Sequence, residues 1–377
     1  MEKHLHIICF TIPYPVDYGG VVDLFWKLPY LQKQGIKIHL HCFEYNRKHQ
    51  SILNNYCTSV HYYKRNGFLK SFFSRLPYIV SSRKSNELEK VLLQDNYPIL
   101  CEGVHSTSIL QDDAFIKRKI VIRLHNVEHQ YYRDLYKATN YLFKKIYLFR
   151  ESILLKKYEN KIAQLQKIIL TVTHQDALVY EKVFKATTVK HLPLFLPENW
   201  SVNCKIGKGN YCLYNGDLSV TANVKAVNWL LDEVISSQPN IQFIIAGKNP
   251  DVTIQSKTTQ LYNVVLVANP STEKMEDLIQ NAHINILPSY SSAGIKLKLL
   301  NALFNGRFCL VNNDTVAGSE LDNLCLIANS SEEFINTIHK KINEDFTTEL
   351  IEQRKLILTK KFNNIANAEL LIENIFD

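Results

Sequence analysis

Residues 284–312 read INILPSYSSAGIKLKLLNALFNGRFCLVN and change hydrophobic pattern twice. A short apolar run over Ile284–Leu287 predicts a buried strand, which Pro288 ends. A turn of small residues follows up to Gly294, and a second apolar run over Phe308–Val311 predicts another strand. Between them, apolar residues at helical spacing predict a helix: Ile295, Leu297, Leu299, Leu300, Leu303 and Phe304. The stretch therefore belongs to a βαβ unit, which indicates an α/β fold with a parallel sheet.

The helix of this unit begins at a small, glycine-containing loop. Backbone N–H groups at such a start are unpaired and carry partial positive charge, so they suit a phosphate. Lys296 and Lys298 add full positive charge in the first turn, where the helix dipole gives cations no advantage. These features indicate a phosphate-binding turn, and an ordinary βα turn with solvated lysines is the alternative.

The length of 377 residues is typical of two domains, and 46% hydrophobic with 21% charged residues describes a globular protein. The eight cysteines never form Cys-x-x-Cys, so neither a disulfide framework nor a zinc site is indicated. The first predicted strand begins at Leu5, which leaves no room for a signal peptide, and no apolar run approaches the ~18 residues of a membrane span. We therefore expect a cytoplasmic protein with reduced cysteines.

The formal net charge of +8 divides unevenly along the chain. Residues 1–195 carry 29 Lys and Arg against 16 Asp and Glu, whereas residues 196–377 carry 15 against 20. A basic first half joined to an acidic second half suggests that only the first faces an anionic surface or polymer.

Strand-like and helix-like segments alternate along both halves, which predicts two doubly wound, mostly parallel sheets. In the first half we expect strands at Leu5–Phe10, Ile38–Phe43, Ser59–Tyr63, Ile99–Cys101, Ile120–Leu124 and Ile168–Val172, and helices at Val21–Gln34, Asn86–Gln94 and Gln130–Gln166. In the second half we expect strands at Tyr211–Tyr214, Gln242–Ala246, Val264–Val267, Ile284–Leu287, Phe308–Val311 and Cys325–Ala328, and helices at Val224–Ser236, Thr272–Asn281 and Lys296–Phe304. A proline-containing connection at 191–200 places the domains at 1–195 and 196–377, with a helical tail over 331–377. Ligands of two such sheets bind in a cleft at the carboxyl ends of the strands.

Two loops of the first half carry candidate site residues. Gly19 and Gly20 follow the first strand and permit close approach of a ligand to the backbone, although a structural turn is an equal alternative. His125 follows the fifth strand and should project at the cleft, and Asn126 is expected to cap the next helix. The string of His125, Glu128 and His129 also resembles a zinc motif, but no third ligand is evident.

Two stretches combine basic and aromatic residues, at 61–90 and 137–167. Such segments can lie in the interface of an anionic membrane leaflet, and the first stretch is the better candidate. For the second, solvated helix faces with their apolar sides packed on the sheet are at least as good an interpretation. Nucleic acid is the rival partner, but no helix-turn-helix, zinc-finger or RNP signature accompanies these stretches.

The layout and its loops resemble the GT-B glycosyltransferases, especially the retaining group called family four. The resemblance covers nearly the whole chain and rests on five stretches in the right order: YPVDYGG, RLHNVEHQYY, YNGDLSVTANVKAVNWLL, FIIAGKNP and LPSYSSAGIKLKLLNALFNGRFCLV. It implies a cleft between an acceptor-binding first domain and a second domain that holds a nucleotide-activated sugar, with the helical tail packing back on the first. It also implies that no metal is needed, and no Asp-x-Asp occurs in the chain.

The resemblance assigns roles to single residues. His125 would be the active-site histidine beside the transferred sugar. Donor-binding residues would be Gly19, Gly20, Gly216, Lys225, Gly294, Ile295, Lys296, Lys298 and Asn301. The family's two glutamates, eight residues apart, correspond here to Ala293 and Asn301. Asn301 therefore offers a neutral amide where the family has a carboxylate that binds the ribose hydroxyls.

The sequence therefore predicts a retaining, metal-independent hexosyltransferase that uses a nucleotide-diphosphate sugar and needs no cofactor. Its acceptor would be a glycan or lipid-linked glycan of envelope polysaccharide assembly, and the enzyme would sit on the inner face of the membrane as a peripheral protein. The altered glutamates leave two alternatives: a catalytically degenerate GT-B binding module, and a sugar-nucleotide epimerase of the same fold.

Overall fold

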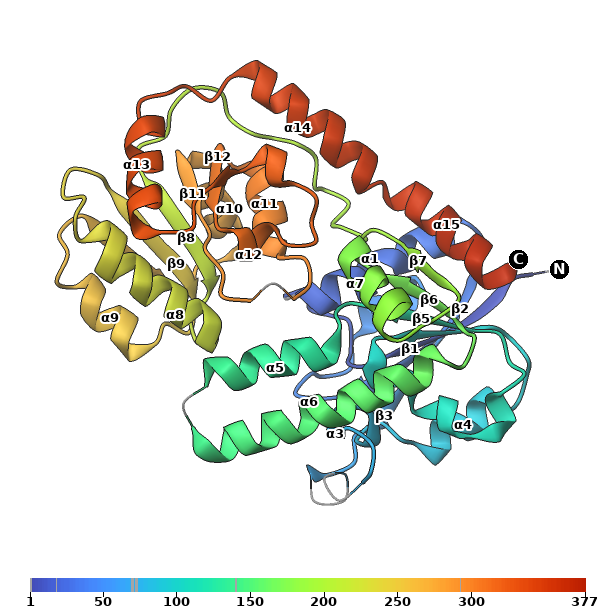
Figure 1. Cartoon of the computed structure of the whole chain (residues 1–377). Coiled ribbons are helices and arrows are strands. Elements are labelled where there is room, and N and C mark those ends of the chain that lie inside the picture. The colour runs from blue at the N-terminus through green and yellow to red at the C-terminus, as the bar shows by residue number, and fades with distance from the viewer. Residues whose placement is uncertain (1, 18, 69–70, 72–73, 140, 292) are drawn as a thin grey trace. The chain divides into compact units, whose positions relative to one another are not determined.

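The computed structural model describes residues 2–17, 19–68, 71, 74–139, 141–291 and 293–377. The chain forms two compact units, Met1–Glu198 with Phe362–Asp377 (unit 1) and Asn199–Lys361 (unit 2). Each unit is an α/β layer structure with one parallel sheet (Figure 1). Lys70, Phe72 and Phe73 of the first basic, aromatic stretch lie outside the described residues.

The sheet of unit 1 has seven strands in the order β3-β2-β1-β4-β5-β6-β7, and every neighbouring pair is parallel. The strand order reverses between β1 and β4, which is where ligands of doubly wound sheets bind. The six expected strands are confirmed to within a residue at each end, and β7 is an additional short strand in the predicted connection. The strands are β1 (His4–Cys9), β2 (Lys37–Glu44), β3 (Ser59–Lys64), β4 (Ile99–Glu102), β5 (Ile120–Leu124), β6 (Ile168–Thr171) and β7 (Val189–His191).

The helices of unit 1 are α1 (Gly19–Lys33), α3 (Tyr78–Ser81), α4 (Asn86–Leu92), α5 (Glu128–Ala138), α6 (Leu142–Ala163), α7 (His174–Leu178) and α15 (Asn364–Phe376). The expected single helical run over 130–166 is wrong. Thr139 and Tyr141 both have extended backbone angles, so the run breaks into α5 and α6. The two helices then pack side by side as a helical hairpin (Figure 1).

The C-terminal helix belongs to unit 1. Leu371 and Ile375 of α15 share a hydrophobic core with Leu24 and Leu28 of α1. The Asn364 side chain accepts a hydrogen bond from the Leu196 N–H at 3.0 Å and donates one to its carbonyl at 2.8 Å. These contacts anchor the last sixteen residues, 362–377, on the first sheet.

The sheet of unit 2 has six parallel strands in the order β10-β9-β8-β11-β12-β13. They are β8 (Cys212–Asp217), β9 (Phe243–Lys248), β10 (Val264–Ala268), β11 (Ile284–Ile286), β12 (Phe308–Val311) and β13 (Leu326–Ile327). The helices are α8 (Thr221–Trp229), α9 (Val252–Thr258), α10 (Thr272–Asn281), α11 (Leu297–Asn305), α12 (Asn313–Val316), α13 (Ser331–Lys341) and α14 (Thr348–Lys361). The two strands and the helix predicted within residues 284–312 are thus β11, α11 and β12.

One glycine of unit 2 is required by close packing. A Cβ on Gly247 of β9 would lie 1.8 Å from the Gly216 carbonyl oxygen of β8, a distance no side chain tolerates. Gly247 therefore lets the two strands keep their pairing up to the loops that follow them.

All eight cysteines are free thiols. Within the described residues, none of the helices has both the length and the apolar character that crossing a bilayer requires.

Candidate active site

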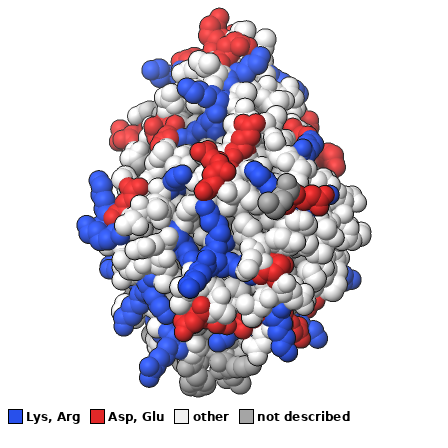
Figure 2. Space-filling model, turned by 90° about the vertical axis from the view of Figure 1, so that its right-hand side faces the viewer, with Lys and Arg blue, Asp and Glu red and all other residues white. Residues whose placement is uncertain are grey.

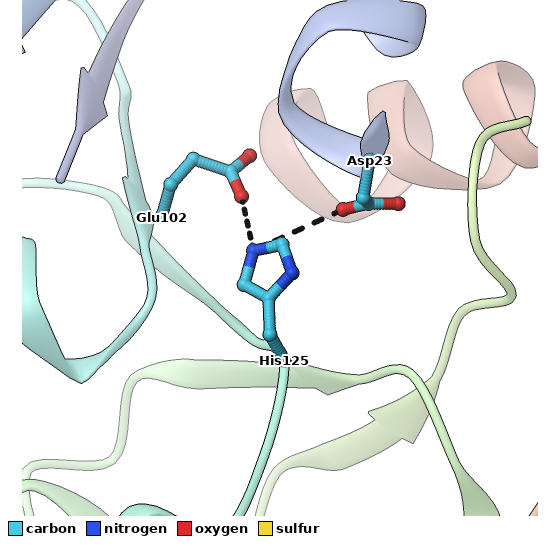
Figure 3. Close-up of side chains that lie close together, drawn as sticks. All are labelled: Asp23, Glu102 and His125. Atoms are coloured by element: carbon cyan, nitrogen blue, oxygen red, sulfur yellow. Dashed lines mark hydrogen bonds and ion pairs between the residues drawn. The ribbon is translucent and has the colours of Figure 1, made fainter. Parts of the chain in front are cut away.

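His125 lies directly after β5, at the carboxyl edge of the unit 1 sheet, as the sequence predicted. Glu102 ends the neighbouring strand β4, and its Oε2 lies 3.0 Å from His125 Nε2 (Figure 3). Asp23 of α1 approaches from the other side, with its Oδ2 4.0 Å from the same nitrogen. The His125 side chain is 10% exposed, whereas both carboxylates are fully buried. One histidine therefore stands at the edge of a buried acidic pair.

Two buried cations neutralise that acidic pair. Lys27 Nζ donates to Asp23 Oδ2 at 2.9 Å and also to Glu102 Oε1. Arg123 of β5 binds Asp23 with both Nε and Nη2, at 3.2 and 3.1 Å. Because buried charges are tolerated only when paired and hydrogen-bonded, the four groups form one interdependent network.

The network keeps both carboxylates ionised. Burial alone would raise the pKa of Asp23, but Arg123 and Lys27 outweigh it and hold that pKa below its usual range. Burial likewise opposes the charge of Glu102, and Lys27 with the His125 hydrogen bond lowers the pKa of Glu102. Both groups are therefore hydrogen-bond acceptors at neutral pH.

The Glu102 contact fixes the state of the His125 ring. A carboxylate accepts hydrogen bonds, so Nε2 carries the proton and donates it to Glu102. Nδ1 is then left to accept a hydrogen bond from a ligand or, in the charged ring, to donate one. No partner of Nδ1 occurs among the described residues, so this atom is the part of the ring that a substrate would meet.

Asp23, Glu102 and His125 are also close enough to hold a metal ion, since one ligand atom of each lies within 4.8 Å of the others. The surroundings do not suit a cation. The Lys27 ammonium already bridges the two carboxylates, and the Arg123 guanidinium binds Asp23. A divalent ion would add two positive charges to a cluster whose negative charges are already compensated.

The helix after His125 begins differently from the sequence prediction. Asn126 is not its cap: the cap residue of α5 is Val127, which makes no side-chain capping bond. Instead, the Glu159 carboxylate of α6 accepts hydrogen bonds from the N–H groups of Glu128 and His129, at 2.7 and 3.1 Å. The first turn of α5 is thus capped by the second helix of the hairpin. His129 Nδ1 contacts the same carboxylate at 2.7 Å, which gives this histidine a structural partner.

Gly294 in unit 2 has φ of +65°, a left-handed conformation that favours glycine, and α11 begins three residues later. Asn312 at the end of β12 holds the start of the turn, because its Nδ2 donates to the Ser289 carbonyl at 2.6 Å. Lys296 is the cap residue of α11, and its Nζ donates to the carbonyls of Ala293 and Gly294. Lys296 therefore folds back over the turn, next to the predicted phosphate-binding amides. Ile295 joins Gly294 to Lys296 in this turn.

Lys298 points to the neighbouring strand and helix. Its Nζ lies 3.2 Å from the Tyr214 hydroxyl of β8 and 3.2 Å from Asn223 Oδ1 of α8. It also stands 4.7 Å from the centre of the Tyr214 ring. Burial, and then the nearby charge of Lys296, lowers the pKa of Lys298 to about 7. Within the described part of the chain no carboxylate contacts this ammonium, so an anionic ligand would restore its charge.

The remaining donor-binding candidates of unit 2 lie around the same strand. Gly216 is near the end of β8, and a Cβ there would meet Asn223 Nδ2 at 3.2 Å. Lys225 lies on α8 with its Nζ 4.4 Å from the centre of the Tyr290 ring, and Tyr290 belongs to the turn before α11. The Asn301 side chain of α11 accepts a hydrogen bond from Asn305 at 2.8 Å. The structure thus connects Gly216 and Lys298 through Asn223, whereas the amide oxygen of Asn301 is engaged within its own helix.

The sequence is similar to a known protein family and to a bacterial relative. Residues 209–344 match the family model described as glycosyl transferases group 1. This domain is a group 1 glycosyltransferase domain. A relative from Klebsiella pneumoniae, described as an uncharacterized 44.6 kDa protein in the cps region, is 28% identical over 336 residues, which span 83% of each chain.

Three solved structures are similar to the whole chain in fold. TarM matches with a TM-score of 0.71 and 11% identity, over 100% of this chain and 99% of TarM. WaaG, a glycosyltransferase involved in lipopolysaccharide biosynthesis, matches with a TM-score of 0.67 and 11% identity, over 99% of both chains. Anabaena HepE in complex with UDP and glucose matches with a TM-score of 0.64 and 10% identity, over 98% of both. Residues 209–344 therefore form a glycosyltransferase domain, and the chain as a whole has the GT-B fold of two Rossmann-like domains.

The sequence analysis did not identify the charged neighbours of His125. Asp23 and Lys27 lie four residues apart on the buried face of α1, and Arg123 interrupts the apolar strand IVIRL. Charged residues inside apolar runs are the signal that could have found them. Asp23 and Lys27 pair within one helix, but the pairs Lys27–Glu102 and Asp23–Arg123 join residues 75 and 100 positions apart and become visible only in the fold. Gly19 and Gly20 are the first two residues of α1, and Gly19 lies four residues before Asp23.

Proposed function

We propose that this glycosyltransferase moves a hexose from a nucleotide-diphosphate sugar to a glycan or lipid-linked glycan, with retention of configuration and without a metal. The observation that carries the proposal is His125, which the buried Glu102 orients at the carboxyl edge of unit 1. The group 1 domain supports a nucleotide-sugar donor, since HepE of the same fold was solved with UDP and glucose. The cps-region relative supports a place in envelope polysaccharide assembly.

In the proposed reaction the donor lies on unit 2 and the acceptor on unit 1. The bond between the anomeric carbon and the diphosphate oxygen breaks, and the acceptor hydroxyl forms the new bond on the same face of the sugar. The proton of that hydroxyl goes to the departing diphosphate oxygen. His125 orients the sugar through Nδ1, and Gly19 with Gly20 lets the backbone come close to the diphosphate and acceptor. The turn at Gly294 and Ile295, together with Lys296 and Lys298, takes up the charge that develops on the leaving group.

The positions of fixed positive charge support the proposal that no metal is needed. Lys296 and Lys298 stand beside the predicted diphosphate turn, and Lys225 lies on the helix after Gly216. Fixed ammonium groups and helix amides can stabilise a leaving diphosphate in place of a divalent ion. In unit 1, Lys27 and Arg123 take the place of a cation between the carboxylates. We therefore expect activity in the presence of a chelator.

We also propose that unit 1 contacts an anionic membrane surface through α6. Its N-terminal half exposes apolar side chains, with Phe143 at 88%, Leu142 at 68% and Ile146 at 59% exposure. An open apolar cavity of about 320 Å³ adjoins them, lined by Phe68, Phe143, Ile146, Tyr147 and Arg150. Lys144 and Lys145 lie between the apolar positions, an arrangement typical of helices that lie in the interface of an anionic leaflet.

This proposal differs from the sequence prediction, which favoured residues 61–90 over residues 137–167 for membrane contact. The interpretation of 137–167 as a helix with its apolar side packed on the sheet is wrong for the first half of α6, which is exposed. In the stretch 61–90, Tyr63 is buried, and Phe68 at 49% exposure adjoins the α6 patch. The second stretch is therefore the better membrane candidate.

The proposed reaction is tested by sugar transfer. The full chain would be incubated in EDTA with radiolabelled nucleotide sugars and lipid-linked glycans extracted from envelope membranes, and label in the glycan fraction would be counted. We expect transfer with one donor family. His125→Ala should lower turnover by roughly 10²- to 10⁴-fold while nucleotide affinity stays unchanged. His174→Ala, which removes an exposed histidine of the same unit, is the matched control. Unchanged turnover in His125→Ala would remove His125 from the mechanism.

A further inference from the structure

Unit 1 contains an open cavity of about 880 Å³ that the reaction above does not use. It is lined by residues 44–49 from the end of β2 onward, residues 64–66 from the end of β3 onward, and Tyr78 at the start of α3. Both strands end at the carboxyl edge of the parallel sheet, the edge that also carries Glu102 and His125. The cavity therefore opens on the side of unit 1 where substrates of doubly wound sheets bind.

The cavity is rich in positive charge. Four cations line it, Arg47, Lys48, Lys64 and Arg65, against the single carboxylate of Glu44. That carboxylate is itself engaged, because His49 Nε2 lies 2.6 Å from Glu44 Oε1. On the face of the molecule that Figure 2 draws, basic and acidic side chains are mixed. Arg47 is paired with Asp17, so the charges available to a ligand are those of Lys48, Lys64 and Arg65. A concave site with these cations attracts anions more strongly than a surface of mixed charge.

Arg65 is held as a rigid part of this cavity. Its guanidinium lies 4.3 Å from the centre of the Tyr45 ring and 5.5 Å from that of Tyr78. Its Nη2 donates to Ser82 Oγ at 3.1 Å, whereas its Nε is buried with no acceptor among the described residues. A guanidinium held over two aromatic rings loses little conformational freedom when it binds a ligand. The Nε–H donor without an acceptor favours a ligand that carries an oxyanion.

Arg47 connects the cavity to the loop that leads to the active site. Its Nη1 donates to the Pro15 carbonyl at 2.6 Å, and its Nη2 pairs with Asp17. The same loop begins with Phe10, whose ring meets the His125 ring edge-on at 5.9 Å between centres. β2 and β5 are three positions apart in the sheet, so the cavity and His125 are separated by roughly 14 Å along its edge.

We propose that this cavity binds a phosphate or carboxylate group of the acceptor, remote from the hydroxyl that receives the sugar. The proposal rests on the proposed function, because it takes unit 1 as the acceptor side. Phosphate and carboxylate share the planar pairs of oxygens that the Arg65 fork matches. The anion would come from the phosphate of a lipid-linked glycan or from an acidic sugar of the glycan itself. The acceptor is therefore an anionic molecule in either case.

The test is calorimetric titration of the full chain at low salt with three probes. Inorganic pyrophosphate represents the lipid-linked phosphate, trigalacturonic acid represents an acidic glycan, and maltotriose is the uncharged trisaccharide control. Each titration is repeated with UDP, GDP or ADP present at high concentration, so that pyrophosphate bound in a nucleotide site of unit 2 is displaced and recognised. Heat that survives every nucleotide and is lost in the cavity variants belongs to the cavity. A failure of donor binding appears separately, as the absence of heat from the nucleotides alone.

We expect one anionic probe to bind at least tenfold more tightly than maltotriose. Arg65→Gln and Lys64→Gln should each weaken that binding by about tenfold or more and leave nucleotide affinity unchanged. Lys64 is exposed, so its variant leaves packing intact, and Lys90→Gln removes an exposed cation of unit 1 outside the cavity as the matched control. Preference for pyrophosphate identifies the lipid phosphate, and preference for trigalacturonic acid identifies the acidic glycan. Equal affinity for all three probes, or wild-type affinity in both cavity variants, would overturn the proposal.

Discussion

Binding of the donor should make the protein take up a proton at Lys298. In the free structure burial and Lys296 lower the pKa of Lys298 to about 7, and its contacts are the neutral Tyr214 hydroxyl and Asn223 oxygen. A diphosphate beside this ammonium supplies the missing negative charge and moves the pKa back toward its ordinary value. Nucleotide affinity and protonation of Lys298 are therefore linked.

The size of the effect depends on pH. At pH 8, a group with a pKa of about 7 is roughly 10% protonated, so full protonation in the complex takes up about 0.9 proton per nucleotide. At pH 6 the group is already about 90% protonated, and uptake at this residue falls to about 0.1 proton. The nucleotide's own phosphates are deprotonated at pH 8, so they release no proton that would mask the uptake.

Calorimetry in buffers of different ionisation enthalpy measures this uptake, since the slope of the observed enthalpy against buffer enthalpy is the number of protons bound. Lys298→Met should abolish the slope at pH 8 and weaken nucleotide binding. Lys274→Met, which removes an exposed lysine of α10 in the same unit, should leave both unchanged. A wild-type slope near zero at pH 8, or an undiminished slope in Lys298→Met, would refute the role given to this lysine.

Three further outcomes are expected. Glu102→Gln should lower turnover by roughly 10²-fold or more with nucleotide affinity unchanged, because it disturbs the His125 tautomer and deprives Lys27 of an ionic partner. Activity equal to wild type would contradict the role of Glu102 in orienting His125. Burial, and then Glu159, raises the pKa of Glu128 to about 8, so the folded state holds a proton that the unfolded state releases between pH 4.5 and 8. Its stability contribution is therefore lost as pH rises through that window. Glu128→Gln should raise the free energy of unfolding at pH 8 by as much as about 4 kcal/mol, and the melting temperature with it, but should change neither at pH 4.5. The double variant Phe143→Asp with Ile146→Asp should lose co-sedimentation with vesicles that contain phosphatidylserine, while its melting temperature stays at the wild-type value; retained binding would contradict membrane contact through α6.

Strand positions in both units could be predicted because buried parallel strands are nearly continuous apolar runs. The run at Ile120–Leu124 coincides with β5, and Phe308–Val311 coincides with β12. β7 was missed because it has three residues and places a lysine and a histidine beside one valine. The helical hairpin was missed because apolar residues keep helical spacing through 139–141, where no proline or glycine marks the break.

The site could be predicted only in part. The position of His125 follows from its place directly after an apolar strand, which local pattern reveals. The partners of His125 do not follow from pattern, because Glu102 and Asp23 reach it through the strand order of the sheet and the packing of α1. In the same way, positive charge at Lys298 was visible in the sequence, but its lowered pKa depends on burial against Tyr214.

Nucleotide binding to the full chain, followed as a thermal shift, tests whether the group 1 domain holds a nucleotide sugar without a metal. UDP, GDP, ADP, CMP and their sugar conjugates would each be added to the wild type, with and without EDTA, and to Lys298→Met. At a hundred times its dissociation constant a ligand adds about 2.7 kcal/mol to the free energy of unfolding, which is readily visible as a higher melting temperature. We expect one nucleotide family to give such a shift, unchanged by EDTA and reduced in Lys298→Met. The absence of a shift with every nucleotide, or a shift that EDTA abolishes, would contradict metal-independent transfer from a nucleotide sugar.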